Sequence, residues 1–310
     1  MDIKPRVIFF GSGPVAAQAL ELLTHHCSIE AVITKPKPSH HKADFPVLEL
    51  AEKLSLPVIT AADRHELSQV VSRTQFKSKL AVLIDFGIIV GQDVIDAFPL
   101  GIVNSHFSLL PQWRGADPIT FSILSGQKET GVSLMLLVEA MDEGPLLAQG
   151  VYKIPLDTTT PQLTDGLVRL SDALLEDALP KHISGEIKPV AQEQAVKMMG
   201  KPFEPTYSRK LTKQDGLIDW QKPAAVIERE IRAYIEWPKS QTALGEVPVA
   251  ITATTVIKTS GKPGSLAIDG KQLIVYCGQN ALQIRKLKPS GKSEMPIEAF
   301  LAGYRAKLDV

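Results

Sequence analysis

The sequence predicts an α/β protein in which a doubly wound, mostly parallel sheet domain is followed by a small OB-like β-barrel domain. Two continuous apolar runs, 6–10 and 80–84, are typical of strands that are buried on both faces of a parallel sheet. The first run leads into Gly11-Ser12-Gly13 and then an amphipathic stretch, the strand, turn and helix that open such a fold. Near the end of the chain, short apolar runs separated by glycine favour a small barrel instead.

The other elements follow from periodicity and from start and stop signals. Further strands of the first domain are expected at 29–33, 56–59, 101–105, 130–137 and 146–154, with the last two paired. Its helices are expected at 17–25, 45–54, 63–76, 94–98, 117–125 and 163–183. The second domain should contain helices at 222–234 and 296–304, and strands at 247–257, 264–268, 272–277 and 281–288.

The chain of 310 residues is long enough for two domains with a sizeable core. Periodicity is lost after residue 190, where Gly200, Pro202 and Pro205 interrupt a polar stretch. We therefore expect a catalytic domain over 1–190, a linker over 191–207 and a C-terminal β-barrel domain over 208–310.

Charge is unevenly distributed although the net charge is zero. Residues 1–205 carry a net charge of −6 and residues 206–310 carry +6. A basic second half suggests contact with a polyanion, although neighbouring domains also differ in charge by chance. No apolar run approaches the length of a membrane span, and the two cysteines make no ligand spacing. A cytoplasmic protein without a signal peptide or a metal site is expected.

Asn104, His106 and Asp142 are the candidates for catalysis. Residues two apart on a strand point the same way, so the amide of Asn104 and the imidazole of His106 should face one site. Transfer of a formyl group to an amine needs a donor for the oxyanion and an acceptor for the proton, which these side chains and the Asp142 carboxylate can supply. The alternatives are a hydrogen-bonded histidine at a strand end and an aspartate in an ordinary turn.

The glycines near the N-terminus also fit a dinucleotide fingerprint, Gly11-x-Gly13-x-x-Ala16. That interpretation requires an acidic residue at the end of the second strand, where the sequence has Thr34-Lys35. Pro14 also lacks the N–H that a pyrophosphate would use. The sequence therefore argues against NAD, and the glycines are explained by a tight turn.

One long motif resembles the 10-formyltetrahydrofolate-dependent formyltransferases: Asn104-x-His106-x-Ser108-Leu109-Leu110-Pro111-x-x-Arg114-Gly115, followed by Asp142. The resemblance implies that Asn104, His106 and Asp142 form the catalytic trio. It also implies that 10-formyltetrahydrofolate is the co-substrate and that its binding residues are Ser108, Leu109, Leu110, Pro111, Phe86, Gly87 and Ile88.

Three further segments are similar to the methionyl-tRNA formyltransferases of that family: Leu211-Thr212-Lys213 with Ile218-Asp219-Trp220, Glu228 to Pro238, and Leu287 to Lys292. The resemblance implies a monomeric enzyme of translation initiation that formylates initiator methionyl-tRNA. Together with the basic charge of the second half, it makes these residues the candidates for tRNA binding: Lys35, Lys37, Lys42, Arg285, Lys286, Lys288 and Lys292.

Other functions remain open at this point. A sugar-nucleotide amine formyltransferase shares the trio and a second domain, whereas glycinamide ribonucleotide formyltransferases lack this C-terminal domain. A catalytically inactive folate- or RNA-binding protein is a further alternative. The chain departs from the tRNA enzymes at Gly13, Gly91 and Phe107, and its basic loop at 35–42 is shorter.

Overall fold

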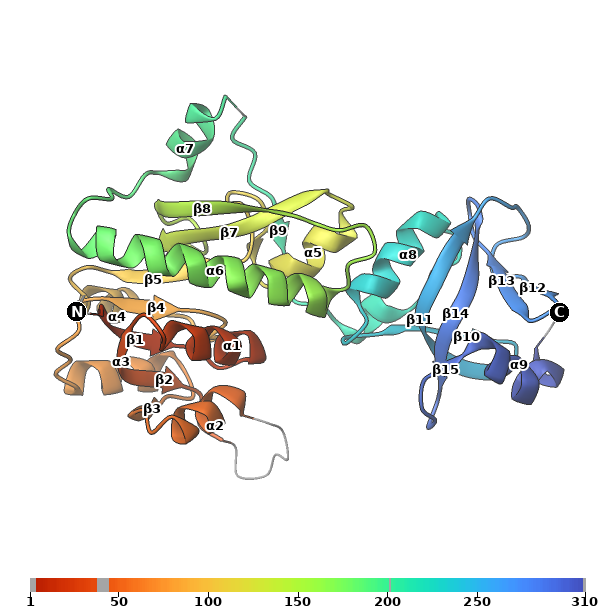
Figure 1. Ribbon diagram of the computed structural model, residues 1–310, viewed down its shortest axis with the longest axis horizontal. Helices are drawn as coiled ribbons and strands as arrows, with labels where there is room; N and C mark the ends of the chain where they lie inside the picture. The colour runs from red at the N-terminus through yellow and green to blue at the C-terminus, as the bar shows by residue number, and fades with distance from the viewer. Residues whose placement is uncertain (1–3, 38–44, 201, 309–310) are drawn as a thin grey trace. The chain divides into compact units, whose positions relative to one another are not determined.

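The computed structural model describes residues 4–37, 45–200 and 202–308, and it divides the chain into two compact units (Figure 1). The N-terminal unit comprises Met1–Pro118, Glu129–Lys153 and Thr164–Ser208. The C-terminal unit comprises Arg209–Val310 together with Ile119–Lys128 and Ile154–Leu163. Two short stretches from the first half of the sequence therefore belong to the second unit. Among the described residues, no helix is both long and apolar enough to cross a membrane.

The N-terminal unit is built on a seven-stranded sheet. Its strands are β1 (Arg6–Phe10), β2 (Ser28–Thr34), β3 (Val58–Thr60), β4 (Ala81–Leu83), β5 (Ile102–His106), β7 (Glu129–Leu136) and β8 (Leu146–Lys153). The order is β3-β2-β1-β4-β5-β7-β8, in which the first five strands are parallel and β7 and β8 are antiparallel to their neighbours. The order reverses between β1 and β4, so a ligand crevice is expected beyond their carboxyl ends.

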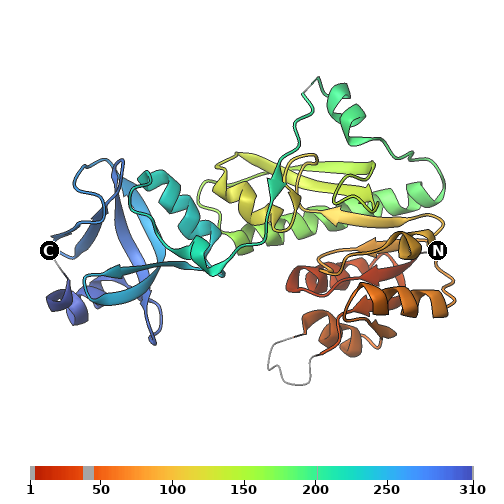
Figure 2. The ribbon, with the colours of Figure 1, turned by 180° about the vertical axis from the view of Figure 1, so that it is seen from behind.

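Helices cover both faces of this sheet, as the two opposite views show (Figures 1 and 2). On one face lie α1 (Pro14–Leu23), α2 (Pro46–Lys53) and α6 (Thr160–Ile183). On the other face α3 (Arg64–Arg73) and α4 (Gln92–Asp96) pack on an apolar cluster that includes Phe10 and Ile102. The carboxylate of Asp63 caps α3 by accepting from the backbone N–H groups of His65 and Glu66. The predicted doubly wound α/β domain is confirmed.

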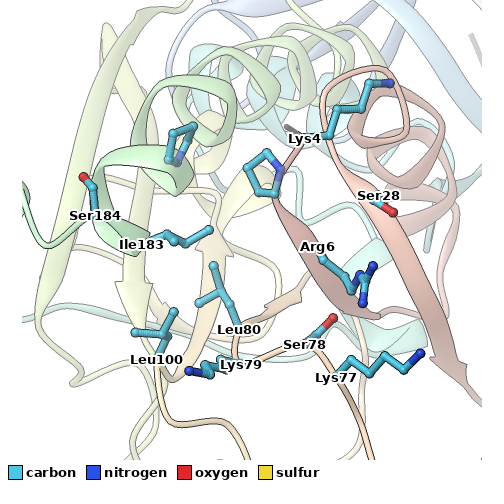
Figure 3. Close-up of a pocket in the computed structure, with 12 residues that line it drawn as sticks. Lys4, Arg6, Ser28, Lys77, Ser78, Lys79, Leu80, Leu100, Ile183 and Ser184 are labelled. Carbon is cyan, nitrogen blue, oxygen red and sulfur yellow. The ribbon is translucent and has the colours of Figure 1, made fainter. Parts of the chain in front are cut away.

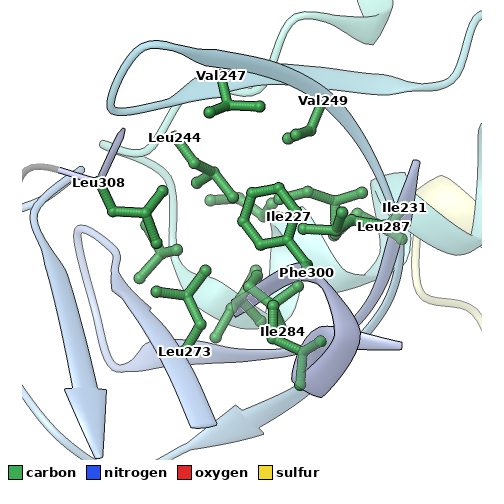
Figure 4. Close-up of a cluster of buried hydrophobic side chains, with 14 of the residues drawn as sticks. Ile227, Ile231, Leu244, Val247, Val249, Leu273, Ile284, Leu287, Phe300 and Leu308 are labelled. Atoms are coloured by element: carbon green, nitrogen blue, oxygen red, sulfur yellow. The ribbon is translucent and has the colours of Figure 1, made fainter. Parts of the chain in front are cut away.

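The C-terminal unit is an antiparallel sheet wrapped around its own core. Its strands are β10 (Ser240–Leu244), β11 (Val247–Ile257), β12 (Leu266–Asp269), β13 (Gln272–Tyr276), β14 (Ala281–Pro289) and β15 (Met295–Pro296). The order is β10-β11-β14-β13-β12, with β15 paired to β14. Helices α8 (Ala224–Ala233) and α9 (Ile297–Tyr304) supply Ile227, Ile231 and Phe300 to the core (Figure 4). Most of α5 (Pro118–Leu124) also belongs to this unit.

The structure contains elements that periodicity did not indicate. The stretch expected as a linker contains α7 (Gln192–Met198) and the short strand β9 (Tyr207–Ser208), which pairs with β6 (Arg114–Gly115). Strand β10 is also new, because its sequence Ser-Gln-Thr-Ala-Leu is too polar to stand out as a strand. The pairing of β9 with β6 matters for function, because it attaches the end of this stretch to the motif that begins at Asn104.

Candidate active site

The motif begins on β5, an interior strand of the sheet between β4 and β7. Asn104 and His106 alternate with Ser105, whose hydroxyl lies 2.6 Å from that of Ser171 on α6. Asn104 and His106 therefore point to the opposite face, the one that α3 and α4 cover further along the strands. Both are buried, at 8% and 6% exposure. Among the described residues the Asn104 amide has no hydrogen-bond partner, so its N–H₂ group is available to a substrate oxygen.

Two oxygens face the imidazole of His106. Its Nε2 lies 2.9 Å from the backbone carbonyl of Trp113, and since a carbonyl only accepts, Nε2 donates. Its Nδ1 lies 3.7 Å from Oδ1 of Asp142, which is ion-pair distance but long for a hydrogen bond. Protonation of the ring would place an N–H opposite each oxygen. The structure therefore brings the side chains of His106 and Asp142 together.

Asp142 lies in the loop between β7 and β8, which the structure closes tightly. Its Oδ2 accepts a 2.6 Å hydrogen bond from the backbone N–H of Gly115, and its backbone has a positive φ of 54°. At the base of the loop, the N–H of Leu136 donates to the carbonyl of Pro145 at 2.9 Å. A Cβ on Gly144 would stand 1.7 Å from the Leu136 carbonyl oxygen, so only glycine fits there. The carboxylate is thus held at a fixed place beside His106.

Arg114 and Gln192 brace this loop from outside the trio. The guanidinium of Arg114, 5% exposed, pairs with the Glu143 carboxylate at 2.9 Å and donates to Oε1 of Gln192 at 2.8 Å. The amide of Gln192, on α7, in turn donates to the carbonyls of Asp142 and Gly144, at 2.7 and 3.0 Å. The guanidinium of Arg114 is therefore paired with a protein carboxylate and not presented as a free cation.

The turn expected to contact folate is fixed by side chains of β7 and β8. Ser133 donates through its hydroxyl to the carbonyl of Ser108 at 2.7 Å and accepts from the N–H of Leu110 at 2.9 Å. Gln149 donates to the carbonyl of Leu110 at 3.0 Å. Ser108 is fully buried, and its own hydroxyl donates within the turn to the carbonyl of Gln112. Leu109 is the half-exposed residue of the turn.

The loop after β4, which contains Phe86, Gly87 and Ile88, offers few side-chain atoms to a folate. Phe86 is 2% exposed and packs edge-on against Phe10 in the sheet core, at 5.4 Å between ring centroids. A ligand could therefore meet the backbone of Phe86 but not its ring. Gly87 and the half-exposed Ile88 are closer to solvent. Phe107, the departure inside the motif, is 7% exposed and so is packed within the protein.

Asp85, at the reversal in strand order, explains the glycine at position 13. Its backbone carbonyl accepts from the N–H groups of Ser12 and Gly13, and a Cβ on Gly13 would stand 1.8 Å from its Oδ2. A larger residue at 13 would displace the carboxylate. Partial removal of water raises the pKa of Asp85 to about 6, and the positive charge of Lys35 opposes this shift.

The cations expected to meet tRNA lie in both units. Lys35 places its Nζ near Gly87, and Lys37 lies 5.7 Å from the centre of the Phe45 ring, whereas Lys42 is outside the described residues. In the C-terminal unit the candidates follow one strand and the turn after it, and all are exposed: Arg285, Lys286, Lys288 and Lys292. Within the described part of the chain, no group of acidic, histidine and cysteine side chains could hold a metal.

Sequence reasoning missed the groups that position the trio. The Trp113 carbonyl and the Gly115 N–H are backbone atoms, which residue types do not reveal. Ser133 and Gln149 are ordinary polar residues, and their only sequence signal is that they alternate with their neighbours on predicted strands. Gln192 has no such signal, because it lies in an aperiodic stretch.

Two family descriptions match the two parts of the chain. Residues 5–179 match the formyl transferase family, and residues 210–305 match the formyl transferase C-terminal domain. The methionyl-tRNA formyltransferase of Roseiflexus castenholzii is 33% identical over 309 residues, covering 97% of this chain and 96% of that protein. The protein of the same name from Chloroflexus aurantiacus is 34% identical over 310 residues, covering 97% of both.

A solved structure shows the same fold at lower identity. The N-formyltransferase of Helicobacter canadensis, in complex with folinic acid and dTDP-3-aminofucose, has a TM-score of 0.66. The alignment covers 93% of this chain and all of that one, at 17% identity. At that identity the likeness concerns the fold alone.

Proposed function

Since this chain belongs to the formyl transferase family, we propose that it transfers the formyl group of 10-formyltetrahydrofolate to the α-amino group of initiator methionyl-tRNA. The products are N-formylmethionyl-tRNA and tetrahydrofolate. The observation that carries this proposal is the placement of Asn104, His106 and Asp142 at one buried site, on a chain about one-third identical over its length to methionyl-tRNA formyltransferases.

The folate supplies the activated formyl group, and the chain supplies its polar environment. The Asn104 amide, without a partner among the described residues, donates to the formyl oxygen as negative charge develops there. The attacking amine must be neutral and must lose a proton during transfer. As the amine nitrogen bonds to the formyl carbon, the bond between that carbon and N10 of the folate breaks. Asp142 and His106 form the relay that takes the proton from the amine and returns one to N10, because the carboxylate and the imidazole already face each other at 3.7 Å.

The resting geometry adds a requirement to this mechanism. Both ring nitrogens of His106 face protein oxygens, those of Trp113 and Asp142. His106 can therefore contact the substrate only by exchanging one of these partners, and the longer contact, to Asp142, is the weaker one. Asp142 retains its hydrogen bond from Gly115 during such an exchange, so the carboxylate stays in place.

Ser108 to Pro111 and the loop from Phe86 to Ile88 are the proposed folate-binding segments. Ser133 and Gln149 hold the first of them in one conformation, which suits a rigid, flat heterocycle. Its backbone and Leu109 can contact such a ring, while the Leu110 side chain, 2% exposed, packs against Met135 and Leu146.

The acceptor is the second half of the proposal. Lys35 and Lys37 in the N-terminal unit and the exposed cations of β14 in the C-terminal unit are proposed to contact tRNA phosphates. A sugar-nucleotide amine acceptor is the alternative, and the Helicobacter canadensis N-formyltransferase, which has the same fold, was solved with such an amine bound. The higher identity to the methionyl-tRNA formyltransferases favours tRNA.

The test supplies 10-formyltetrahydrofolate together with either methionyl-tRNA or a sugar-nucleotide amine, and measures the formylated product. We expect formylmethionyl-tRNA, and we expect Asn104→Ala to reduce turnover by at least about a hundredfold, the effect of removing one oxyanion donor. Gln194→Ala, at an exposed amide on α7, is the control and should retain activity. Product from the sugar-nucleotide alone would replace tRNA as the acceptor, and wild-type turnover by Asn104→Ala would remove Asn104 from the mechanism.

A further inference from the structure

A cavity of about 740 Å³ lies at the amino ends of the sheet strands of the N-terminal unit (Figure 3). Its walls come from the segment before β1, the residues that precede β4 and β5, and the C-terminal end of α6. Asn104 and His106 stand at the other end of β5, where the strand finishes. The cavity is therefore a separate place from the proposed formyl-transfer site, at the opposite edge of the sheet.

Four cationic side chains line this cavity: Lys4, Arg6, Lys77 and Lys79. All four are exposed, and none forms an ion pair with any residue that the structure describes. Residues 1–205 carry a net charge of −6, so a cluster of cations in this cavity is not explained by the overall composition of that part of the chain. The Nζ of Lys4 donates to the carbonyl of Thr24 at 3.1 Å, and Arg6 interacts with the Glu30 carboxylate. The positive charge that remains in this concave site attracts anions.

One acid, Glu30, lies beside these cations. The Glu30 carboxylate accepts hydrogen bonds from the backbone N–H groups of Lys77 and Ser78, at 2.8 and 2.7 Å, and from the Ser78 hydroxyl at 2.6 Å. Although burial opposes it, these bonds and the positive charge of Arg6 keep the pKa of Glu30 below its ordinary value, so the carboxylate stays ionised beside the cations. The bonds also fix the backbone from which Lys77 and Lys79 extend, so the two lysines start from a defined place.

The opposite wall is apolar. Leu80, Leu100 and Ile183 lie together on one side of the view in Figure 3, across from Arg6 and Lys77. Leu80 is only 1% exposed, so Leu100 and Ile183 provide the accessible apolar surface. A purely electrostatic surface for a nucleic-acid backbone has no need of such a wall. A small ligand with an anionic end and a flat or apolar body can use both sides, and the volume is within the range of small-molecule sites.

We propose that this cavity binds a small phosphate ester of mononucleotide size, with its phosphates against Arg6, Lys77 and Lys79 and its body against Leu100 and Ile183. Lys and Arg are the side chains that bind phosphate. The site is independent of the formyl-transfer chemistry, and its existence does not rest on the identity of the formyl acceptor.

The test is titration calorimetry of the full chain with two probes, ATP and inorganic pyrophosphate. We expect saturable binding of both, with ATP the tighter ligand because pyrophosphate has no body to contact the apolar wall. Lys77→Glu/Lys79→Glu should weaken the binding of both probes at least tenfold. Ile183→Ala should weaken ATP binding and leave pyrophosphate binding unchanged.

The matched control makes the same change of charge elsewhere in the unit, at two exposed lysines: Lys53→Glu/Lys188→Glu. It should bind both probes like wild type, and all variants should retain formyl transfer and their thermal unfolding profile. Absence of saturable ATP binding at millimolar concentration overturns the proposal, as does an equal loss in the control. Weakened tRNA binding in Lys77→Glu/Lys79→Glu without nucleotide binding by wild type would also overturn it and assign the surface to RNA.

Discussion

The glycine at position 13, where the related tRNA enzymes differ, is matched by the neighbouring side chain of Asp85. The carboxylate of Asp85 occupies the space that a side chain at position 13 would fill. The consequence is an acid held beside the ligand crevice of the sheet with its pKa raised to about 6. Ionisation of this carboxyl therefore costs more in the folded chain than in the unfolded one.

This difference predicts a dependence of stability on pH. The folded protein binds the Asp85 proton more tightly than the unfolded chain, whose carboxyl titrates near the ordinary value of 3.8. The group therefore lowers the stability of wild type as pH rises from about 4 to about 6. Asp85→Asn removes that penalty, so it should melt above wild type at pH 7.5 and lose this advantage at pH 4. The gain is modest, because Asp85 remains exposed to solvent.

Thermal unfolding at pH 4, 5.5 and 7.5 measures the effect. Asp165→Asn, at an exposed acid on α6, is the control and should show no such trend. A melting difference between Asp85→Asn and wild type that is the same at all three pH values would contradict the assignment.

At the scale of elements, α7 acts on the site although it lies far from the trio in sequence. Its single buried amide, Gln192, satisfies the carbonyls of Asp142 and Gly144 and accepts from Arg114. Gln192→Leu leaves these groups buried and unpaired, which costs about 1–3 kcal/mol each when water cannot replace the partner. We expect lower stability in denaturant and a lower kcat, because the Asp142 loop loses its brace.

Gln194→Leu makes the same chemical change two residues away, where the side chain is exposed. It should leave stability and kcat near wild type. If Gln192→Leu lowers stability but leaves kcat unchanged, the brace serves the fold and not the placement of the carboxylate.

At the scale of the whole molecule, acidic residues are in excess in the first 205 residues and basic residues in the rest. If the basic strand β14 meets tRNA, each phosphate contact that is removed should lower the dependence of binding on salt, by roughly 0.7–0.9 in the log–log slope. Lys286→Glu/Lys288→Glu should therefore weaken tRNA binding and reduce the log–log salt slope by about the amount expected for two lost phosphate contacts. Filter binding at several salt concentrations measures both quantities.

Lys258→Glu/Lys271→Glu reverses two exposed charges of the same unit outside β14 and is the control. Equal losses in the two double variants would show a general effect of net charge. An unchanged slope in the β14 variant would exclude this strand from the tRNA interface.

Sequence patterns predicted the large elements because burial leaves periodicity behind. The apolar run at 80–84 indicated a buried strand, and the two-residue spacing of Asn104 and His106 indicated that they share one face of a strand. The structure confirmed the sheet and its topology class. The meeting of Asp142 with His106 came from family resemblance, since nothing in a turn aspartate indicates its partner 36 residues earlier. Backbone donors and acceptors, and Gln192 on its short helix, were beyond reach because they depend on how loops close. Phe86 shows the reverse case, in which a motif residue is required by the core.

The tight closure of the loop at 137–145 has a consequence for variation in chain length. Surface loops usually accept insertions and deletions at little cost. Here the hydrogen bond between Leu136 and Pro145 closes the base of the loop, and the Gln192 amide donates hydrogen bonds to the carbonyls of Asp142 and Gly144. One added or missing residue would rotate the carboxylate of Asp142 away from His106 even if every side chain were retained. Related chains that keep this chemistry should therefore vary in the amino-acid sequence of this segment but not in its length.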